Sequence, residues 1–139
     1  MQTVSVIRQM NKGDKVRVHN YFHSVLRNNK SEKNIQFMGW LLKTPEPNEV
    51  FDGTLSGYHK TQGIVTYTDA YANLGNGLKI DDGSFTAPVS GIYYFHFQGL
   101  TDTSEANFIN IKQNGQIVAS TFRKKREVNL QNSFKHAKN

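Results

Sequence analysis

The sequence predicts an all-β protein, a ten-stranded jelly-roll β-sandwich. Short apolar or alternating segments recur between Gly, Asn and Asp residues at the spacing typical of sandwiches, and long amphipathic helical patterns are missing. Aromatic residues make up 12% of the 139 residues and gather in short runs rather than in helical stripes. The chain has the length of one domain, which is enough to bury a core without disulfides.

Ten segments have the composition and length of strands. They are residues 4–10, 15–21, 35–43, 51–55, 64–67, 77–80, 84–88, 92–100, 108–113 and 116–122. Ten strands fit a jelly roll of two sheets. Between the last two segments, Asn114-Gly115 is the clearest hairpin signal, because both residues accept a positive φ.

The segment 91–97 is the most informative strand. Strand geometry sends Tyr93, Phe95 and Phe97 to one face and the residues between them to the other, and both faces are largely apolar. A strand of a sandwich usually needs only one apolar face. The second face must then be covered by further structure or buried in an oligomer, and we expect the oligomer.

A Pro-containing stretch, residues 44–50, interrupts this pattern. It has no periodicity, and its prolines cannot join a central sheet ladder, so it is predicted to be a connector. The connector divides the chain into residues 1–43 and residues 51–139. Neither part contains an internal repeat.

Residues 67–97 carry a set of spaced positions that resembles the signature of the complement C1q domain family, which belongs to the C1q/tumour necrosis factor superfamily. The matching positions are Tyr67, Asn73, Leu78, Phe85, Gly91, Tyr93, Phe95 and Phe97. Only Tyr67 departs from the pattern, since Phe is usual there. Residues 83–91 also look like the G-x-F-x-x-P-x-x-G stretch of that family.

The order of the two parts is reversed relative to the family. Residues 1–43, with a Gly13-Asp14 strand start and the segment 37–42, resemble what normally follows the signature region. We therefore interpret residues 1–139 as one circularly permuted C1q-like domain: 1–43 form the C-terminal half of the usual order and 51–139 the N-terminal half. Two partial domains on either side of a linker would give a similar order, but no element is duplicated.

The resemblance implies a non-enzymatic, trimerising module that binds protein, glycan or other surface ligands outside the cell. It makes Tyr93, Phe95, Phe97, Phe37 and Trp40 candidates for the trimer interface or the subunit core. Enzyme motifs such as a nucleophile elbow, a P-loop or a dinucleotide fingerprint are absent from the sequence, so we expect no catalysis.

Two alternative functions remain. Jelly rolls also build capsids and coats, so a structural or assembly role is the first. The second is binding of a heparin-like polyanion, because the net charge is +6 and the densest basic cluster is Arg123, Lys124, Lys125 and Arg126. Nucleic acid is not the expected partner, since the resembled family is mostly secreted.

A secreted protein would allow N-glycosylation, and Asn29 begins an Asn-Lys-Ser sequon in a polar loop. The first residues lack the layout of a secretory signal. No apolar run approaches 18 residues, so we expect no membrane span.

No cofactor or metal is expected. The chain has no cysteine, and His19 and His23 have a spacing that would bring two imidazoles together only on a helix, not on a strand. Some members of the resembled family bind calcium. Asp102, Glu105 and Asn114 offer oxygen atoms but form no recognised calcium loop.

Overall fold

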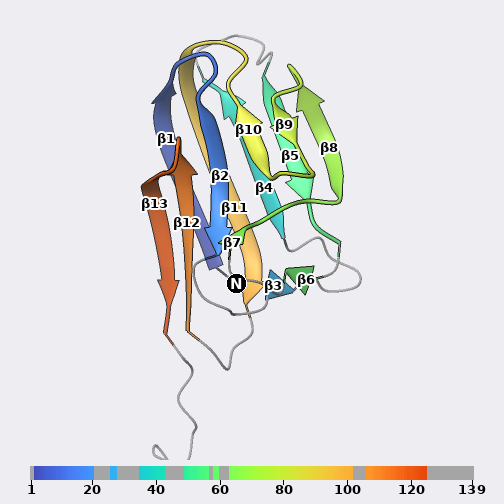
Figure 1. Ribbon diagram of the computed structural model, residues 1–139, viewed down its shortest axis with the longest axis vertical. Coiled ribbons are helices and arrows are strands. Elements are labelled where there is room, and N and C mark those ends of the chain that lie inside the picture. The colour runs from blue at the N-terminus through green and yellow to red at the C-terminus, as the bar shows by residue number, and fades with distance from the viewer. Residues whose placement is uncertain are drawn as a thin grey trace, which may run out of the picture.

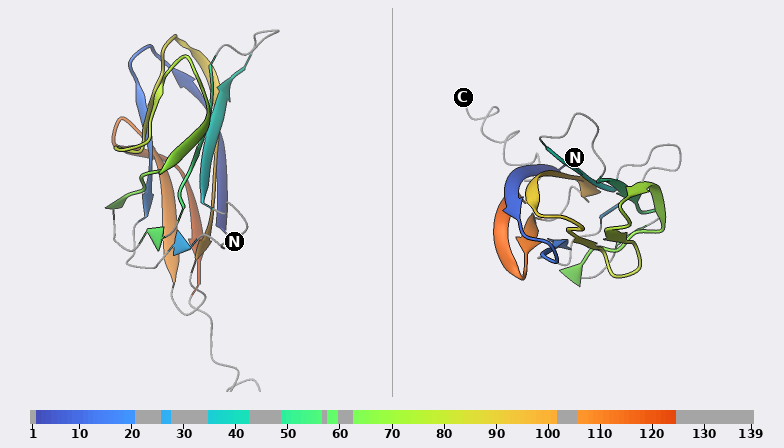
Figure 2. Two further views of the ribbon diagram at one scale, coloured as in Figure 1. Left: turned by 90° about the vertical axis from the view of Figure 1, so that its right-hand side faces the viewer. Right: turned by 90° about the horizontal axis from the view of Figure 1, so that it is seen from above.

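A computed structural model of the chain shows two antiparallel β-sheets packed face to face (Figures 1 and 2). It describes residues 2–20, 26–27, 35–42, 49–56, 58–59, 63–101 and 106–124. Turned by 90°, the two layers are seen edge on, with the longest strands running along the long axis of the molecule (Figure 2). This arrangement confirms the predicted all-β sandwich.

The first sheet, sheet I, has five main strands in the order β1-β11-β4-β5-β8, all antiparallel to their neighbours. The short strands β3 and β6 extend it at the end of β11. The strands are β1 (Gln2–Met10), β3 (Leu26–Arg27), β4 (Gln36–Leu41), β5 (Val50–Thr54), β6 (Tyr58–His59), β8 (Asp69–Leu74) and β11 (Gly91–Thr101).

The second sheet, sheet II, has the order β13-β12-β2-β10-β9, and β7 pairs with the end of β2. Its strands are β2 (Lys15–Asn20), β7 (Gly63–Ile64), β9 (Leu78–Lys79), β10 (Ser84–Thr86), β12 (Asn107–Gln113) and β13 (Gln116–Arg123). The β12–β13 hairpin turns at Asn114 and Gly115, with φ of 50° and 83°. Both residues have the positive φ that the sequence predicts for this turn.

Strands from residues 1–43 lie between strands from residues 51–139 in both sheets. In sheet I, β4 is hydrogen-bonded to β11 on one side and to β5 on the other. In sheet II, β2 lies between β12 and β10. The two parts of the chain therefore form one sandwich with a common interior.

Aromatic rings fill the middle of that interior. Phe37 of β4 contacts Phe51 of β5 edge to face, with ring centroids 4.8 Å apart, and Phe51 stacks on Phe85 of β10 at 4.5 Å. Phe95 of β11 lies within 6.3 Å of all three of these rings. Because the rings come from both sheets and from both parts of the chain, the core depends on the complete strand set.

The strand count is a correction to the sequence prediction, because thirteen strands occur in the described residues rather than ten. The longest addition is β8, whose side chains are mostly exposed and whose sequence therefore lacks the apolar alternation used to find strands. The added β3 and β6 have two residues each. Val50, placed in the connector, is the first residue of β5 and pairs with Trp40.

Candidate functional site

The outer face of sheet I is the candidate functional surface, and β11 lies at its centre. Along this strand Tyr93, Phe95 and Phe97 are fully buried between the sheets. The intervening Tyr94 and His96 are half-buried and point to the outer face. The alternation predicted from the sequence is therefore present, with the even-numbered residues facing outward.

The five residues proposed for the trimer interface or the core fall on different sides of this sheet. Phe37, Tyr93, Phe95 and Phe97 have no exposed surface and belong to the core of one subunit. Trp40 is 37% exposed, because it lies three residues after Phe37 on β4 and its side chain therefore points to the opposite face of the sheet. Of the five, only Trp40 offers its side chain to a partner molecule.

An apolar row crosses the outer face of sheet I from one edge strand to the other. Successive strand pairings place Ile7 opposite Tyr94, Tyr94 opposite Trp40, Trp40 opposite Val50 and Val50 opposite Leu74. Three of its members are large exposed apolar side chains: Ile7 is 60% exposed, Trp40 37% and Leu74 58%. The Trp40 and Tyr94 rings are in contact, with centroids 4.5 Å apart.

Most of this row could not be found from the sequence. Ile7, Val50 and Leu74 come from three strands that are distant along the chain, and only the pairing register aligns them. The apolar even-numbered positions of β11 were the one sequence signal for the surface.

A polar network adjoins the row. The Ser5 hydroxyl oxygen lies 2.7 Å from His96 Nδ1, and the Tyr94 hydroxyl donates a hydrogen bond to Ser5 Oγ at 3.2 Å. His96 Nε2 lies 3.4 Å from an amide oxygen, that of Gln98. The His96 ring is therefore held between two polar side chains, those of Ser5 and Gln98.

The basic cluster predicted as a polyanion site begins at the end of sheet II. Arg123 is the last residue of β13, and Lys124 follows it with an exposed side chain. Lys125 and Arg126 lie outside the described residues, and so does the glycosylation candidate Asn29.

Of the residues considered as metal ligands, only His19 and Asn114 are described; His23, Asp102 and Glu105 are not. Asn114 Oδ1 accepts a hydrogen bond from the backbone of Lys15, and its Nδ2 donates to Asp14 at 3.0 Å. These bonds give Asn114 a role in the turn. In the ranges that the structure covers, no group of three or more His, Cys, Asp or Glu side chains has an arrangement that could hold a metal ion.

The described segments contain no helix with the length and apolar character needed to cross a membrane. A comparison with protein families finds a match between residues 51–137 and the model of the C1q domain. The match covers more than half of the chain and includes the aromatic strand β11. No solved structure matches the chain.

Proposed function

Because this chain belongs to the C1q domain family, whose members are non-enzymatic and typically trimerise, we propose that it is a homotrimeric recognition module. We further propose that its subunits associate through the outer face of sheet I. The ligands we expect are proteins, glycans or other surface molecules.

The observation that carries the assembly proposal is the apolar row on the outer face of sheet I. Outer faces of sandwiches are normally polar, yet this row is apolar on all five strands that it crosses. At its centre Trp40 and Tyr94 form an aromatic pair, and such residues are enriched in protein interfaces. In a closed trimer this face would pack against a different surface of the neighbouring subunit, such as its edge, and that contact would remove these side chains from water.

Light scattering coupled to size-exclusion chromatography tests the proposal. We expect the native protein to have about three times the 15.8 kDa mass of one chain at micromolar concentration. Replacing Trp40 and Tyr94 with Thr, which keeps the strand propensity, should give monomers. The matched control replaces the exposed Ile117 and Phe122 of sheet II with Thr and should remain trimeric.

Three outcomes contradict the assembly proposal. A native protein that is strictly monomeric would refute it, and a trimer that survives the Trp40/Tyr94 substitutions would refute the assigned surface. Large shells or layers in electron micrographs would favour the alternative role of a capsid or coat subunit.

We also propose that the domain is circularly permuted. Two contacts support this reading. Gln2 at the start of β1 donates a hydrogen bond of 3.5 Å to the carbonyl oxygen of Thr121 near the end of β13, so the two strand ends to be joined in the usual order lie close together. At the connector, Leu41 N–H donates to Glu49 O at 3.0 Å, which makes β4 and β5 antiparallel neighbours.

A rearranged chain tests the permutation. In this chain residues 49–139 come first and are followed by residues 1–43, so that Glu49 and Val50 keep their contacts with β4. We expect it to fold cooperatively and to show the same far-UV circular dichroism spectrum and the same molar mass as the native chain, because every strand pairing is retained. An unfolded or aggregated product, with the native chain as the folded control, would count against the permutation.

C1q family proteins are generally secreted, and we propose an extracellular location for this one. Expression behind a secretory leader in eukaryotic cells should then yield soluble trimer. Replacement of Asn29 with Gln tests the sequon, since it should abolish any mobility shift produced by glycosidase treatment. Retention of misfolded protein inside the cell would contradict the proposed location.

A further inference from the structure

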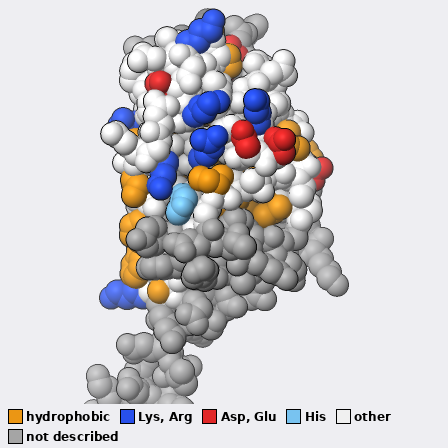
Figure 3. All heavy atoms as spheres, in the orientation of Figure 1, with side chains coloured by type: hydrophobic (Ala, Val, Ile, Leu, Met, Phe, Trp, Pro, Cys, Tyr) orange, Lys and Arg blue, Asp and Glu red, His pale blue; other side chains and the backbone are white. Residues whose placement is uncertain are grey.

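The outer face of sheet II carries a cluster of cations, which we call the sheet II basic face: Lys15, Arg17, Lys79 and Lys112. Figure 3 shows Lys and Arg side chains gathered over the middle of this face, with acidic side chains to one side. The face lies on the opposite side of the sandwich from the apolar row. It would therefore stay accessible in a trimer assembled through sheet I.

Strand pairing fixes the spacing of these cations. Lys79 lies opposite Ser84, and Arg17 opposite Lys112, in one line across the sheet. With strands about 4.8 Å apart, this line extends for roughly 14 Å from Lys79 to Lys112. Lys15 is two residues from Arg17 on the same face, about 6.8 Å along the strand.

The arrangement is unfavourable for the isolated fold. Arg17 and Lys112 are direct cross-strand neighbours, and like charges in that position destabilise a sheet. The only ion pair within the described ranges joins Arg17 to Asp82, at 3.9 Å and between partly exposed groups. Such a long surface pair contributes little to stability, so it does not offset the repulsion between Arg17 and Lys112.

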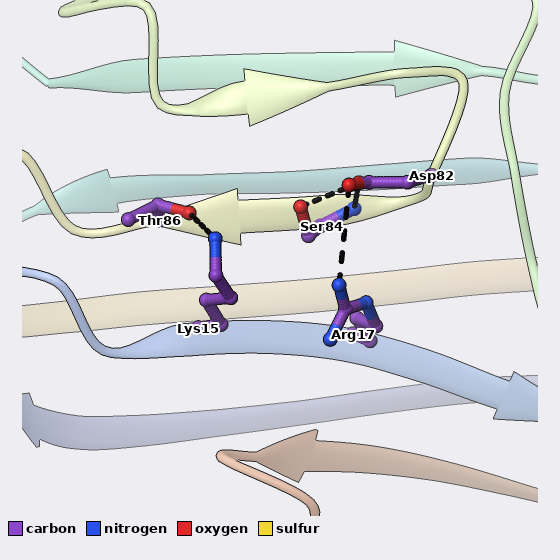
Figure 4. Close-up of polar contacts among 5 residues, drawn as sticks. All are labelled: Lys15, Arg17, Asp82, Ser84 and Thr86. Atoms are coloured by element: carbon purple, nitrogen blue, oxygen red, sulfur yellow. Dashed lines mark hydrogen bonds and ion pairs between the residues drawn. The ribbon is translucent and has the colours of Figure 1, made fainter.

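The Asp82 side chain is hydrogen-bonded within the turn before β10 (Figure 4). It accepts hydrogen bonds from the backbone N–H and the hydroxyl of Ser84. Burial raises the pKa of the Asp82 carboxyl, but the Ser84 hydrogen bonds and the charges of Arg17 and Lys79 outweigh it and lower the pKa overall. Asp81 in the same turn is exposed and forms no ion pair with any cation in the described ranges.

The short side chains between the cations are hydroxyls. Ser84 lies between Lys79 and Arg17, and Lys15 Nζ donates a hydrogen bond to Thr86 Oγ1 at 2.8 Å (Figure 4). The line of cations contains no aromatic ring on which a nucleobase would stack. Closely spaced cations with hydroxyl neighbours suit a ligand with closely spaced oxyanions and many hydroxyl groups.

From this charge complementarity we propose that the sheet II basic face binds a sulfated glycan. The inference rests on the proposed recognition function and names its ligand class and its site. It does not depend on the trimer. It also differs from binding through the basic segment at Arg123–Arg126, because the sheet II basic face is built from β2, β9 and β12.

Heparin, a sulfated glycan, is the probe. The first variant replaces Lys79 and Lys112 with Gln, which leaves the Arg17–Asp82 pair intact. Each lost contact should reduce the slope of log K against log salt by roughly 1 and weaken binding about fivefold to tenfold at 0.1 M salt. The matched control replaces Lys124 and Lys125 with Gln and should elute from immobilised heparin close to the native position.

A second variant should strengthen binding. Asp82→Asn removes the carboxylate nearest to Arg17 but keeps an oxygen that can accept the Ser84 hydrogen bonds. We expect it to elute at higher salt than the native protein, an outcome that misfolding would not produce. A Lys79→Arg/Lys112→Arg variant should retain native binding because it keeps both charges.

The outcomes separate this inference from the proposed assembly. Unchanged heparin binding in the Lys79/Lys112 variant, or an equal loss in the Lys124/Lys125 control, would overturn the site. Equal dependence on Lys79 and Lys112 for single-stranded DNA of the same charge would overturn the glycan assignment in favour of nucleic acid. Molar mass is measured on the same samples, so a failed trimer is seen independently of failed glycan binding.

Discussion

Truncation of Phe37 tests whether the two parts of the chain share one core. Phe37 belongs to residues 1–43, yet its three ring partners come from beyond the connector: Phe51 at 4.8 Å, Tyr67 at 5.9 Å and Phe95 at 6.3 Å. Its side chain has no exposed surface. Phe37→Ala should therefore lower the free energy of unfolding by about 3–5 kcal/mol, a large fraction of the roughly 5–15 kcal/mol typical of a domain.

Urea unfolding provides the assay. Trp40, the single tryptophan, reports on β4 by fluorescence, and far-UV circular dichroism reports on all strands. We expect the two transitions to coincide in the native protein and in the variant. Val89→Ala, at an exposed turn position, is the control and should change stability by no more than about 0.5 kcal/mol.

A double-mutant cycle sharpens the test. Phe37→Leu and Phe51→Leu together should show a coupling energy of about 0.5–1.5 kcal/mol, because the two rings pack edge to face. A cost below 1 kcal/mol for Phe37→Ala, or two separate transitions of which one is unaffected, would refute the shared core.

Three further predictions follow from single positions. Tyr67→Phe should leave the free energy of unfolding unchanged or raise it by about 1 kcal/mol, since the buried Tyr67 hydroxyl has no hydrogen-bond partner in the part of the chain described. A clear loss of stability in a urea titration would contradict this. Gly39→Ala should lower the free energy of unfolding by about 1–3 kcal/mol, because the new Cβ would lie 2.6 Å from both Phe51 Cε1 and the carbonyl oxygen of residue 94. Native-like stability would show that both the Phe51 ring and the β11 backbone can shift. Burial and the charge of Lys112 lower the pKa of His19 in the folded state, so the unfolded chain binds a proton more readily at this site. The free energy of unfolding should therefore fall as pH drops below about 6.5, and it should fall less in His19→Gln. An identical dependence of stability on pH in the two proteins would exclude this contribution.

Local sequence features predicted the strands that face the core. Segments such as 91–97 alternate between buried and half-exposed positions as predicted, and the Asn114-Gly115 turn has the expected backbone conformation. Strand β8 was missed, since an edge strand with exposed side chains lacks the apolar period that marks a core strand.

The sequence by itself determined the fold class and the family resemblance, because hydrophobic period and turn chemistry act over a few neighbouring residues. Only the tertiary structure decided which residues share a surface. The apolar row brings Ile7, Trp40 and Leu74 into one line, and the sheet II basic face joins Lys79 to Lys112. Both depend on pairing between strands far apart in the chain, where a shift of one residue would turn the side chains to the opposite face.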